Sequence, residues 1–419
     1  MYQSEILDNG IQVITERMEN VRSVAIGIWF RVGSRDEQPG QYGLSHFMEH
    51  MFFKGTSQRD ALAISQDFES LGAEQNAFTS KEYTCYYARV VDDKLPAVLE
   101  IIADMLMDSQ FAPEGLESER EVVIEEIARG EDTPQDYVFE LFAAAAMPGH
   151  GLGRPIAGSR ESVSAFQQAD CLSYLQAHYN AANCIVVATG HVDQAEMVTL
   201  VQKYLAGMTA GHRQTRQTFQ GQAEPFYLLQ KDTEQANLVY GLPGLPLGDA
   251  DRFAGQIMDA ALGGGMSSRL FQEIREKRGL AYAVFSATDS YLGAGSFLVY
   301  VGTRPENLLE VVSLIQSELA RLLAAGLTPA ELQRMQDYLV GNTVLAQEST
   351  ASRMIRLGRN AVCDQEILSL NEIIERLRAV TLNDVQRVAE RILRATPTLA
   401  VISPLATAGL QAELNQLLA

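Results

Sequence analysis

The chain has 419 residues, of which 47% are hydrophobic and 21% are charged. This balance excludes a disordered or fibrous protein and allows two or more domains with buried cores. The net charge of −20 argues against nucleic acid or an anionic membrane as the main ligand, whereas a basic partner would suit it.

The start of the chain and its cysteines indicate a compartment. The first residues, MYQSEILDNGIQVI, have neither a basic region nor an apolar run, and no stretch of the sequence is apolar for long enough to span a membrane. The cysteines are too few and too scattered for a disulfide framework: Cys85, Cys171, Cys184 and Cys363. We therefore expect a cytoplasmic protein with reduced cysteines and no membrane partner.

The first half of the chain alternates strand-like and helix-like patterns. Its β-branched and aromatic residues predict strands in IQVITE, SVAIGIWFRVGS and YTCYYARVV, with a turn at 8–10. Apolar residues at helical spacing predict helices over 59–71, 94–107, 114–130 and 167–178. A strand over 184–190 ends this half, which is therefore α+β.

A polar segment over 209–225, TAGHRQTRQTFQGQAEP, is the predicted linker. After it the order of the first half is repeated: strands FYLLQ and ANLVYGL, a helix, the strands AYAVFSATDS and AGSFLVYVG, two helices, and the final strand TLAVISP. We therefore predict an α+β fold of two homologous domains, 1–208 and 226–419, related by duplication. Each is expected to be a mostly antiparallel sheet packed with helices.

The segment HFMEH contains the residues best suited to catalysis. Residues four apart share one face of a helix, so His46 and His50 can bind the same metal ion. Glu49 lies beside them and can take a proton from metal-bound water, which is the general-base role in metal-assisted hydrolysis. The pattern is the inverted form of the HExxH zinc motif. All histidines precede residue 213, so only the first domain is expected to retain this chemistry.

A third ligand is expected on the acidic helix at 114–130, because a catalytic zinc ion usually has three protein ligands. For each glutamate there a solvated helix face is an alternative explanation: Glu114, Glu117, Glu119, Glu121, Glu125 and Glu126. Glu119 and Glu126 are seven residues apart and share a face, which we expect to include Val122 and Val123. A zinc ligand and a second carboxylate that orients a histidine would explain two acids on a partly apolar face.

Together these motifs resemble the inverzincin peptidases of the pitrilysin, insulinase and mitochondrial-processing-peptidase clan, family M16. The spacing of the two glutamates from HxxEH matches, as do EDTPQDYVFELF and LGRPIAGSRESV. The length and the duplication resemble the short, bacterial-type subfamily. The resemblance implies one Zn²⁺ per chain, bound by His46, His50 and Glu126. It also implies that Glu49 is the base and that Glu119 orients a ligand.

The second half contains LGGGMSSRLFQEIREKRGLAYAVFS, which resembles the family's other signature. In that signature an arginine and a tyrosine, here Arg275 and Tyr282, hold the substrate carbonyl near the zinc ion. Both groups could stabilise a developing oxyanion. A surface arginine and a sheet-packing tyrosine are the alternative. No GK[ST] follows the glycines at 263–265, so we expect a helix-ending turn there and no phosphate loop.

Further substrate contacts are implied by the same resemblance. Residues 72–79 resemble the family's edge strand, which would bind an extended peptide by strand addition at Asn76, Ala77 and Phe78. Phe53 resembles the aromatic residue that lines the pocket on the primed side of the scissile bond. An ordinary sheet edge and a core phenylalanine are the respective alternatives.

Asp136 and Glu140 fall where the processing peptidase has acids that bind substrate arginine.

From these motifs together we expect a zinc metalloendopeptidase that hydrolyses extended or unfolded peptides, basic ones included, in an enclosed acidic chamber. One chain contains both the zinc motif and the Arg/Tyr pair, so a homodimer is expected, with no nucleic-acid partner. The alternative is a catalytically inactive structural or peptide-binding subunit of the same family. Such subunits typically have a broken zinc motif.

Overall fold

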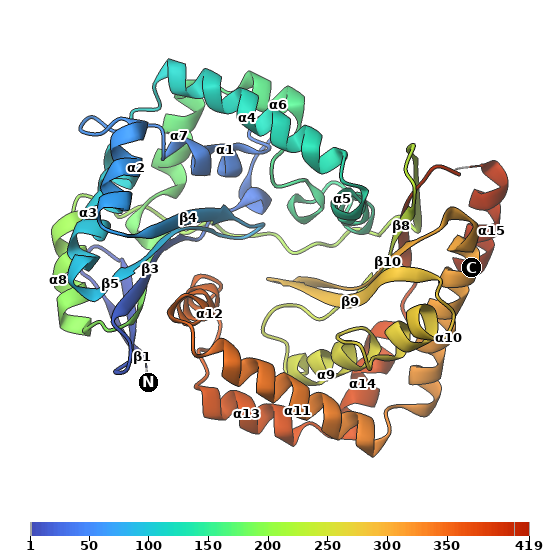
Figure 1. The fold of residues 1–419 in the computed structure, drawn as a ribbon. Coiled ribbons are helices and arrows are strands. Elements are labelled where there is room, and N and C mark those ends of the chain that lie inside the picture. Colours follow the sequence, from blue (N-terminus) through green and yellow to red (C-terminus); the bar gives the residue numbers. More distant parts are fainter. Residues whose placement is uncertain (1, 406, 419) are drawn as a thin grey trace. The chain divides into compact units, whose positions relative to one another are not determined.

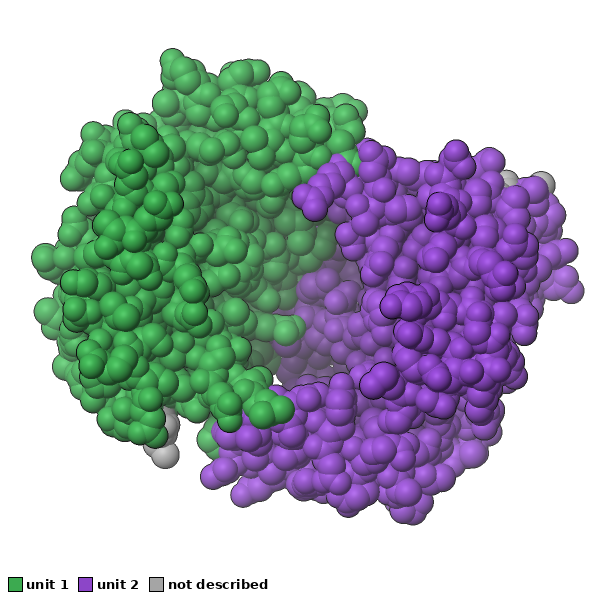
Figure 2. Space-filling view, in the orientation of Figure 1, with its two compact units in different colours: residues 1–128, 154–216, 345–369 green, residues 129–153, 217–344, 370–419 purple. Residues whose placement is uncertain are grey.

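The computed structural model describes residues 2–405 and 407–418 and contains two sheets packed with helices (Figure 1). The chain forms two compact units, which Figure 2 colours separately. Unit 1 comprises residues up to 128, 154–216 and 345–369, and unit 2 comprises 129–153, 217–344 and residues from 370 on. These units are defined by packing, whereas the predicted boundary at 209–225 concerns the duplicated halves of the sequence and stays a prediction.

The sheet of unit 1 has the strand order β1-β2-β6-β3-β5-β4. Its strands are β1 (Tyr2–Ile6), β2 (Gln12–Arg17), β3 (Ser23–Phe30), β4 (Glu74–Thr79), β5 (Thr84–Val91) and β6 (Cys184–Gly190). β2 and β6 run parallel, and the other neighbours are antiparallel. β4 is therefore an edge strand, with one side of its backbone outside the sheet.

One face of this sheet is buried beneath helices of unit 1. Alternate residues of β3, namely Val24, Ile26, Ile28 and Phe30, all lie in that core, as the period of a strand requires. The helices are α1 (Leu44–Met51), α2 (Ala61–Ser70), α3 (Leu95–Asp108), α4 (Pro113–Glu131), α6 (Arg160–Ala165), α7 (Gln168–His178) and α8 (Gln194–Leu205). The helices predicted over 59–71, 94–107, 114–130 and 167–178 are confirmed as α2, α3, α4 and α7, with ends shifted by at most two residues.

The opposite face of the sheet is covered by a helix from far along the chain. α12 (Thr350–Val362) packs against β3 and β6, on the side away from α1 (Figure 1). Gly358 lies against the indole of Trp29, and a Cβ at this position would overlap that ring. Glu16 forms an ion pair with Arg353 at 2.8 Å, which fixes the helix to the sheet. α12 thus belongs to the core of unit 1.

Replacing Gly358 by alanine is expected to destabilise unit 1 by about 2 kcal/mol, because the added methyl group would overpack a buried contact. Urea unfolding followed by the fluorescence of Trp29, the only tryptophan of the chain, measures the effect. Gly341→Ala is the control, because a Cβ there meets no atom within 4 Å. Gly341 lies inside helix α11 (Pro329–Ala346), where alanine should leave stability unchanged or raise it slightly. Equal stability of the Gly358→Ala chain would contradict this account of α12 packing.

The sheet of unit 2 repeats the strand arrangement of unit 1. Its order, β7-β11-β8-β10-β9, matches β2-β6-β3-β5-β4, and the first pair is again parallel. The strands are β7 (Phe226–Gln230), β8 (Ala236–Pro243), β9 (Ala281–Tyr291), β10 (Ala294–Thr303) and β11 (Thr398–Ser403). The predicted α+β fold of two duplicated, mostly antiparallel units is therefore confirmed.

Unit 2 also has a sheet face covered by a helix from the other half of the chain. α5 (Pro134–Ala146) places Val138, Leu141 and Phe142 on β8, β10 and β11. The other helices that lie in unit 2 wholly or mainly are α9 (Arg252–Leu262), a π-helix at Phe271–Glu276, α10 (Leu308–Ala325), α11 (Pro329–Ala346), α13 (Leu370–Ala379), α14 (Leu382–Leu393) and α15 (Ala408–Leu418). Gly263 caps α9, which confirms the helix-ending turn predicted at 263–265.

The first part of the predicted linker packs on unit 1. The Arg216 guanidinium donates to both carboxylate oxygens of Asp36, at 2.8 and 2.7 Å, and both side chains are largely buried. Arg213 forms an ion pair with Asp364 at 3.2 Å. A polar sequence therefore does not mean a solvated segment here, because its arginines bind acids of unit 1.

Candidate metal centre

Helix α1 presents both histidines of the HxxEH motif. Its other face, with Phe47 and Met48, is fully buried in the core of unit 1. The buried carboxylate of Glu37 caps its first turn and accepts hydrogen bonds from the backbone N–H groups of Gly43 and Ser45, both at 2.8 Å. Burial outweighs these hydrogen bonds and raises the pKa of Glu37 to about 7. The core and this cap together fix the orientation of α1.

Helix α4 supplies both acids that the sequence singles out. Its buried side chains include Glu119 and Val123, while Glu126 is exposed on its metal-facing side. Val122 is three residues after Glu119 and four before Glu126, so it lies on their side of the helix. It is 41% exposed, whereas Val123 is buried, so only part of this apolar face is buried.

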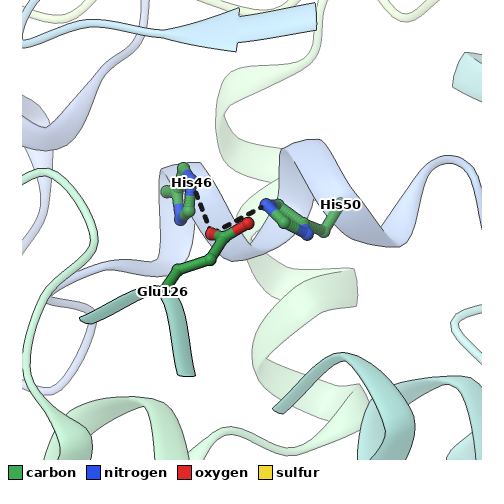
Figure 3. Close-up of side chains that lie close together, drawn as sticks. All are labelled: His46, His50 and Glu126. Carbon is green, nitrogen blue, oxygen red and sulfur yellow. Dashed lines mark ion pairs between the residues drawn. The ribbon is translucent and has the colours of Figure 1, made fainter. Parts of the chain in front are cut away.

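The side chains of His46, His50 and Glu126 converge between α1 and α4 (Figure 3). One Glu126 oxygen, Oε2, lies 3.7 Å from His46 Nε2 and 3.5 Å from His50 Nε2. A ligand atom from each residue lies within 4.8 Å of the other two. It is the single group of this kind among the residues that the structure describes. These are the residues that the sequence indicates as metal ligands.

The chemistry of this group fits zinc. His50 Nδ1 is hydrogen-bonded to Glu119 Oε2 at 3.0 Å, and donation there leaves the Nε2 lone pair directed towards Glu126. His46 Nδ1 is buried without a hydrogen-bond partner among the described residues, and the other ring nitrogen, Nε2, lies near Glu126. Burial, aided by neighbouring His50, lowers the pKa of His46 to about 4, which keeps its imidazole neutral. Two neutral imidazoles and a carboxylate form a zinc-type donor set.

The electrostatics of the same group favour a cation. Burial by itself lowers the pKa of His50, but the hydrogen bond to Glu119 and the charges of Glu126 and Glu49 outweigh it, so the pKa is raised. The acids around this ring thus stabilise a positive charge at its position. A divalent ion between the three ligands would supply that charge.

Glu49 is placed to act as a base. Its Oε2 accepts a hydrogen bond from Thr79 Oγ1 at 2.6 Å, which holds the carboxylate at the end of β4. Burial is the main cause that raises the pKa of Glu49, against the opposing effect of Thr79. A raised pKa brings a carboxylate closer to the range in which a general base is effective at neutral pH. No pattern in the sequence indicates that Thr79 contacts the predicted base.

The structure places Asn76, Ala77 and Phe78 on β4, which the strand order confirms as a sheet edge. Phe78 packs edge-on against Trp29, with ring centroids 5.5 Å apart. Phe53 is partly buried and packs against the core of unit 1. That position fits the core alternative, and binding of peptide at these four residues stays a prediction.

The other predicted contacts belong to unit 2, whereas the metal group belongs to unit 1. Arg275 and Tyr282 are in contact: Arg275 Nη1 donates to the Tyr282 carbonyl oxygen at 2.6 Å, and the guanidinium carbon lies 4.6 Å from the centroid of the tyrosine ring. Tyr282 is 78% exposed, which contradicts the alternative of a sheet-packing side chain. Asp136 and Glu140 are exposed on α5, one turn apart.

Comparison with known proteins identifies the family. Residues 12–160 match the family model described as insulinase (peptidase family M16), and residues 165–339 match the model described as the M16 inactive domain. An uncharacterized zinc protease of Streptomyces coelicolor is 41% identical over 95% of this chain and 89% of its own. Another, from Bacillus subtilis, is 38% identical over 94% of this chain and 97% of its own.

Solved structures agree in fold. A crystal structure from Pseudomonas fluorescens titled as a peptidase M16 inactive domain has a TM-score of 0.91 at 20% identity and covers 97% of this chain and 98% of its own. A protease from Helicobacter pylori has a TM-score of 0.89 at 22% identity, over 96% and 100%. Among the described residues, no helix has the length and hydropathy to cross a bilayer. The family models and the zinc-protease relatives together show that the chain belongs to peptidase family M16, in its short bacterial-type subfamily.

Proposed function

We propose that the protein is a zinc-dependent metalloendopeptidase. The observation that supports this most directly is the convergence of His46, His50 and Glu126, with Glu49 on the same helix as both histidines. Zinc held by three protein ligands would supply a Lewis acid that polarises the scissile carbonyl and lowers the pKa of water in the remaining position. This combination of ligands and base is that of metal-assisted hydrolysis.

Each residue of the site has a distinct role in this proposal. Glu49 takes a proton at its carboxylate from the attacking water and can pass it to the leaving amine. Thr79 holds that carboxylate by its 2.6 Å hydrogen bond. Glu119 fixes the ring of His50 through Nδ1. These contacts fix the positions of the base and of one ligand, which is the preorganisation that catalysis of this kind uses.

We also propose that the substrate is an extended or unfolded peptide. β4 is a sheet edge, and Thr79 at its end contacts the base, so a peptide strand paired with β4 would run towards Glu49. Arg275 and Tyr282 are proposed to stabilise the oxyanion. The preference for basic peptides, the acidic chamber and the homodimer stay predictions.

The alternative, an inactive subunit of the same family, is less well supported by the residues. The family model described as inactive matches residues 165–339, whereas the metal group lies within residues 12–160. This distribution agrees with the expectation that only one of two duplicated halves retains the site. The complete set of ligands and base favours an active enzyme.

Removal of the metal tests the proposal. Dialysis against a chelator is expected to abolish cleavage of a quenched fluorescent peptide that contains basic residues, and one equivalent of Zn²⁺ per chain should restore it. Zinc content, measured by atomic absorption, should follow activity. If the zinc-loaded chain cleaves no member of a varied peptide library, the inactive alternative would replace the proposal.

A further inference from the structure

A lysine outside the metal group lies directly behind it. Lys54 follows α1 by three residues and is 31% exposed at its side chain. Its Nζ forms an ion pair with Glu119 Oε1, while Glu119 Oε2 accepts the hydrogen bond from His50 Nδ1. One series of contacts thus joins Lys54 through Glu119 to a metal ligand.

The burial of Glu119 explains why a cation is needed there. Only 4% of its side chain is exposed, and a buried carboxylate is costly unless it is paired with a positive charge and hydrogen-bonded. His50 cannot provide that charge when it binds a metal ion, because a ligating imidazole is neutral. Lys54 is not part of the metal group, so its ammonium group can still pair with Glu119 when His50 binds a metal ion.

Helix α4 leaves room for the stem of this lysine. Gly115 lies one turn before Glu119, and a Cβ at Gly115 would lie 3.3 Å from Lys54 Cβ and 3.9 Å from Lys54 Cγ. Glycine inside a helix is destabilising relative to alanine. Because Gly115 has no side chain, the aliphatic part of Lys54 can lie close to α4, where its ammonium group reaches Glu119.

We propose that Lys54 is a positioning residue of the metal centre, which holds the Glu119 carboxylate in place through its ion pair so that Glu119 orients His50 as a ligand. The inference rests on the metal group of the proposed function, but it concerns metal affinity and does not require peptide hydrolysis. Lys54 acts only through Glu119, so its effect should disappear when Glu119 is replaced by glutamine.

Zinc affinity, measured by competition with a chromophoric chelator, tests this inference in a double-mutant cycle. Lys54→Met is expected to raise the zinc dissociation constant about tenfold, the lower end of the loss caused by removing an outer partner of a ligand. Glu119→Gln should raise it by about the same factor or more, and the double variant should match Glu119→Gln. Lys54→Arg, which keeps the charge, should restore most of the affinity.

Lys94→Met is the matched control. Lys94 is exposed in the same unit and forms an ion pair with exposed Asp93 at 3.6 Å, so its loss removes the same charge without touching the metal group. Its zinc affinity should equal that of the wild type. Thermal unfolding of the zinc-free chains must show that Lys54→Met is fully folded at the assay temperature, which separates an effect on the metal site from a loss of folded protein.

Two results would overturn the inference. One is a zinc dissociation constant of Lys54→Met within about twofold of the wild type, and the other is full additivity of Lys54→Met and Glu119→Gln in the double variant. If the wild type itself binds no zinc, the proposed function fails together with this inference. If the wild type binds zinc and Lys54→Met binds it equally well, only the inference fails.

Discussion

The Glu49→Gln chain is expected to bind zinc as the wild type does and to cleave peptide at least about a thousandfold more slowly, within the range attributed to general acid–base catalysis. The amide keeps the size of the side chain and can still accept the Thr79 hydrogen bond, which is 2.6 Å long in the wild type. It cannot take a proton from water at neutral pH. The loss should therefore appear in kcat, measured with a quenched fluorescent peptide at saturating zinc.

Glu117→Gln is a control for this prediction. Glu117 lies on the exposed side of α4, with 68% of its side chain accessible, so its replacement should leave hydrolysis unchanged. Zinc content must be measured for both variants, since loss of metal would also abolish activity. A zinc-loaded Glu49→Gln chain that retains most of its activity would show that Glu49 is not the base.

The Glu126→Gln chain is expected to lose zinc. An amide oxygen is a weaker ligand than a carboxylate, and it removes the negative charge that lies 3.5 Å from His50 Nε2 and 3.7 Å from His46 Nε2. The zinc dissociation constant should rise by more than about 100-fold, beyond the loss caused by removing an outer partner. The metal content should be measured after dialysis. Peptide cleavage at limiting zinc should fall in parallel with it.

Glu125→Gln provides a matched comparison on the same helix. Glu125 is the exposed neighbour of Glu126 and is not part of the metal group. Its replacement removes the same charge one residue away and should not change zinc affinity. Equal losses in both variants would mean that the acidity of α4 as a whole, and not one ligand, holds the metal ion.

The sequence predicted part of the candidate metal group because local geometry determines half of the site. His46 and His50 must share a face of any helix that contains both, and Glu119 and Glu126 follow the same rule on the second helix. Which glutamate faces the histidines was implied by a family resemblance, and the structure confirms that Glu126 does. The apolar pattern did not show that Val122 would be exposed while Val123 is buried, because burial depends on what packs against the helix.

Contacts between distant segments could not be predicted from the sequence. Thr79 reaches Glu49 because β4 ends beside α1, and Lys54 reaches Glu119 because Gly115 lets it cross α4. No local sequence pattern predicts these contacts, since each depends on how two elements pack.

The sequence by itself determined the α+β class, the duplicated order of strands and helices, the HxxEH helix and the acidic helix. These follow from periodicity and spacing, which are local properties of the chain. The tertiary structure alone decided which sheets α12 and α5 cover. Each of these helices packs on the sheet of one unit, although the residues before and after its segment belong to the other unit. It also decided which hydroxyl group contacts Glu49 and which ammonium group contacts Glu119. The physical reason is that burial and charge pairing are satisfied by whichever segment packs there, however distant it is along the chain.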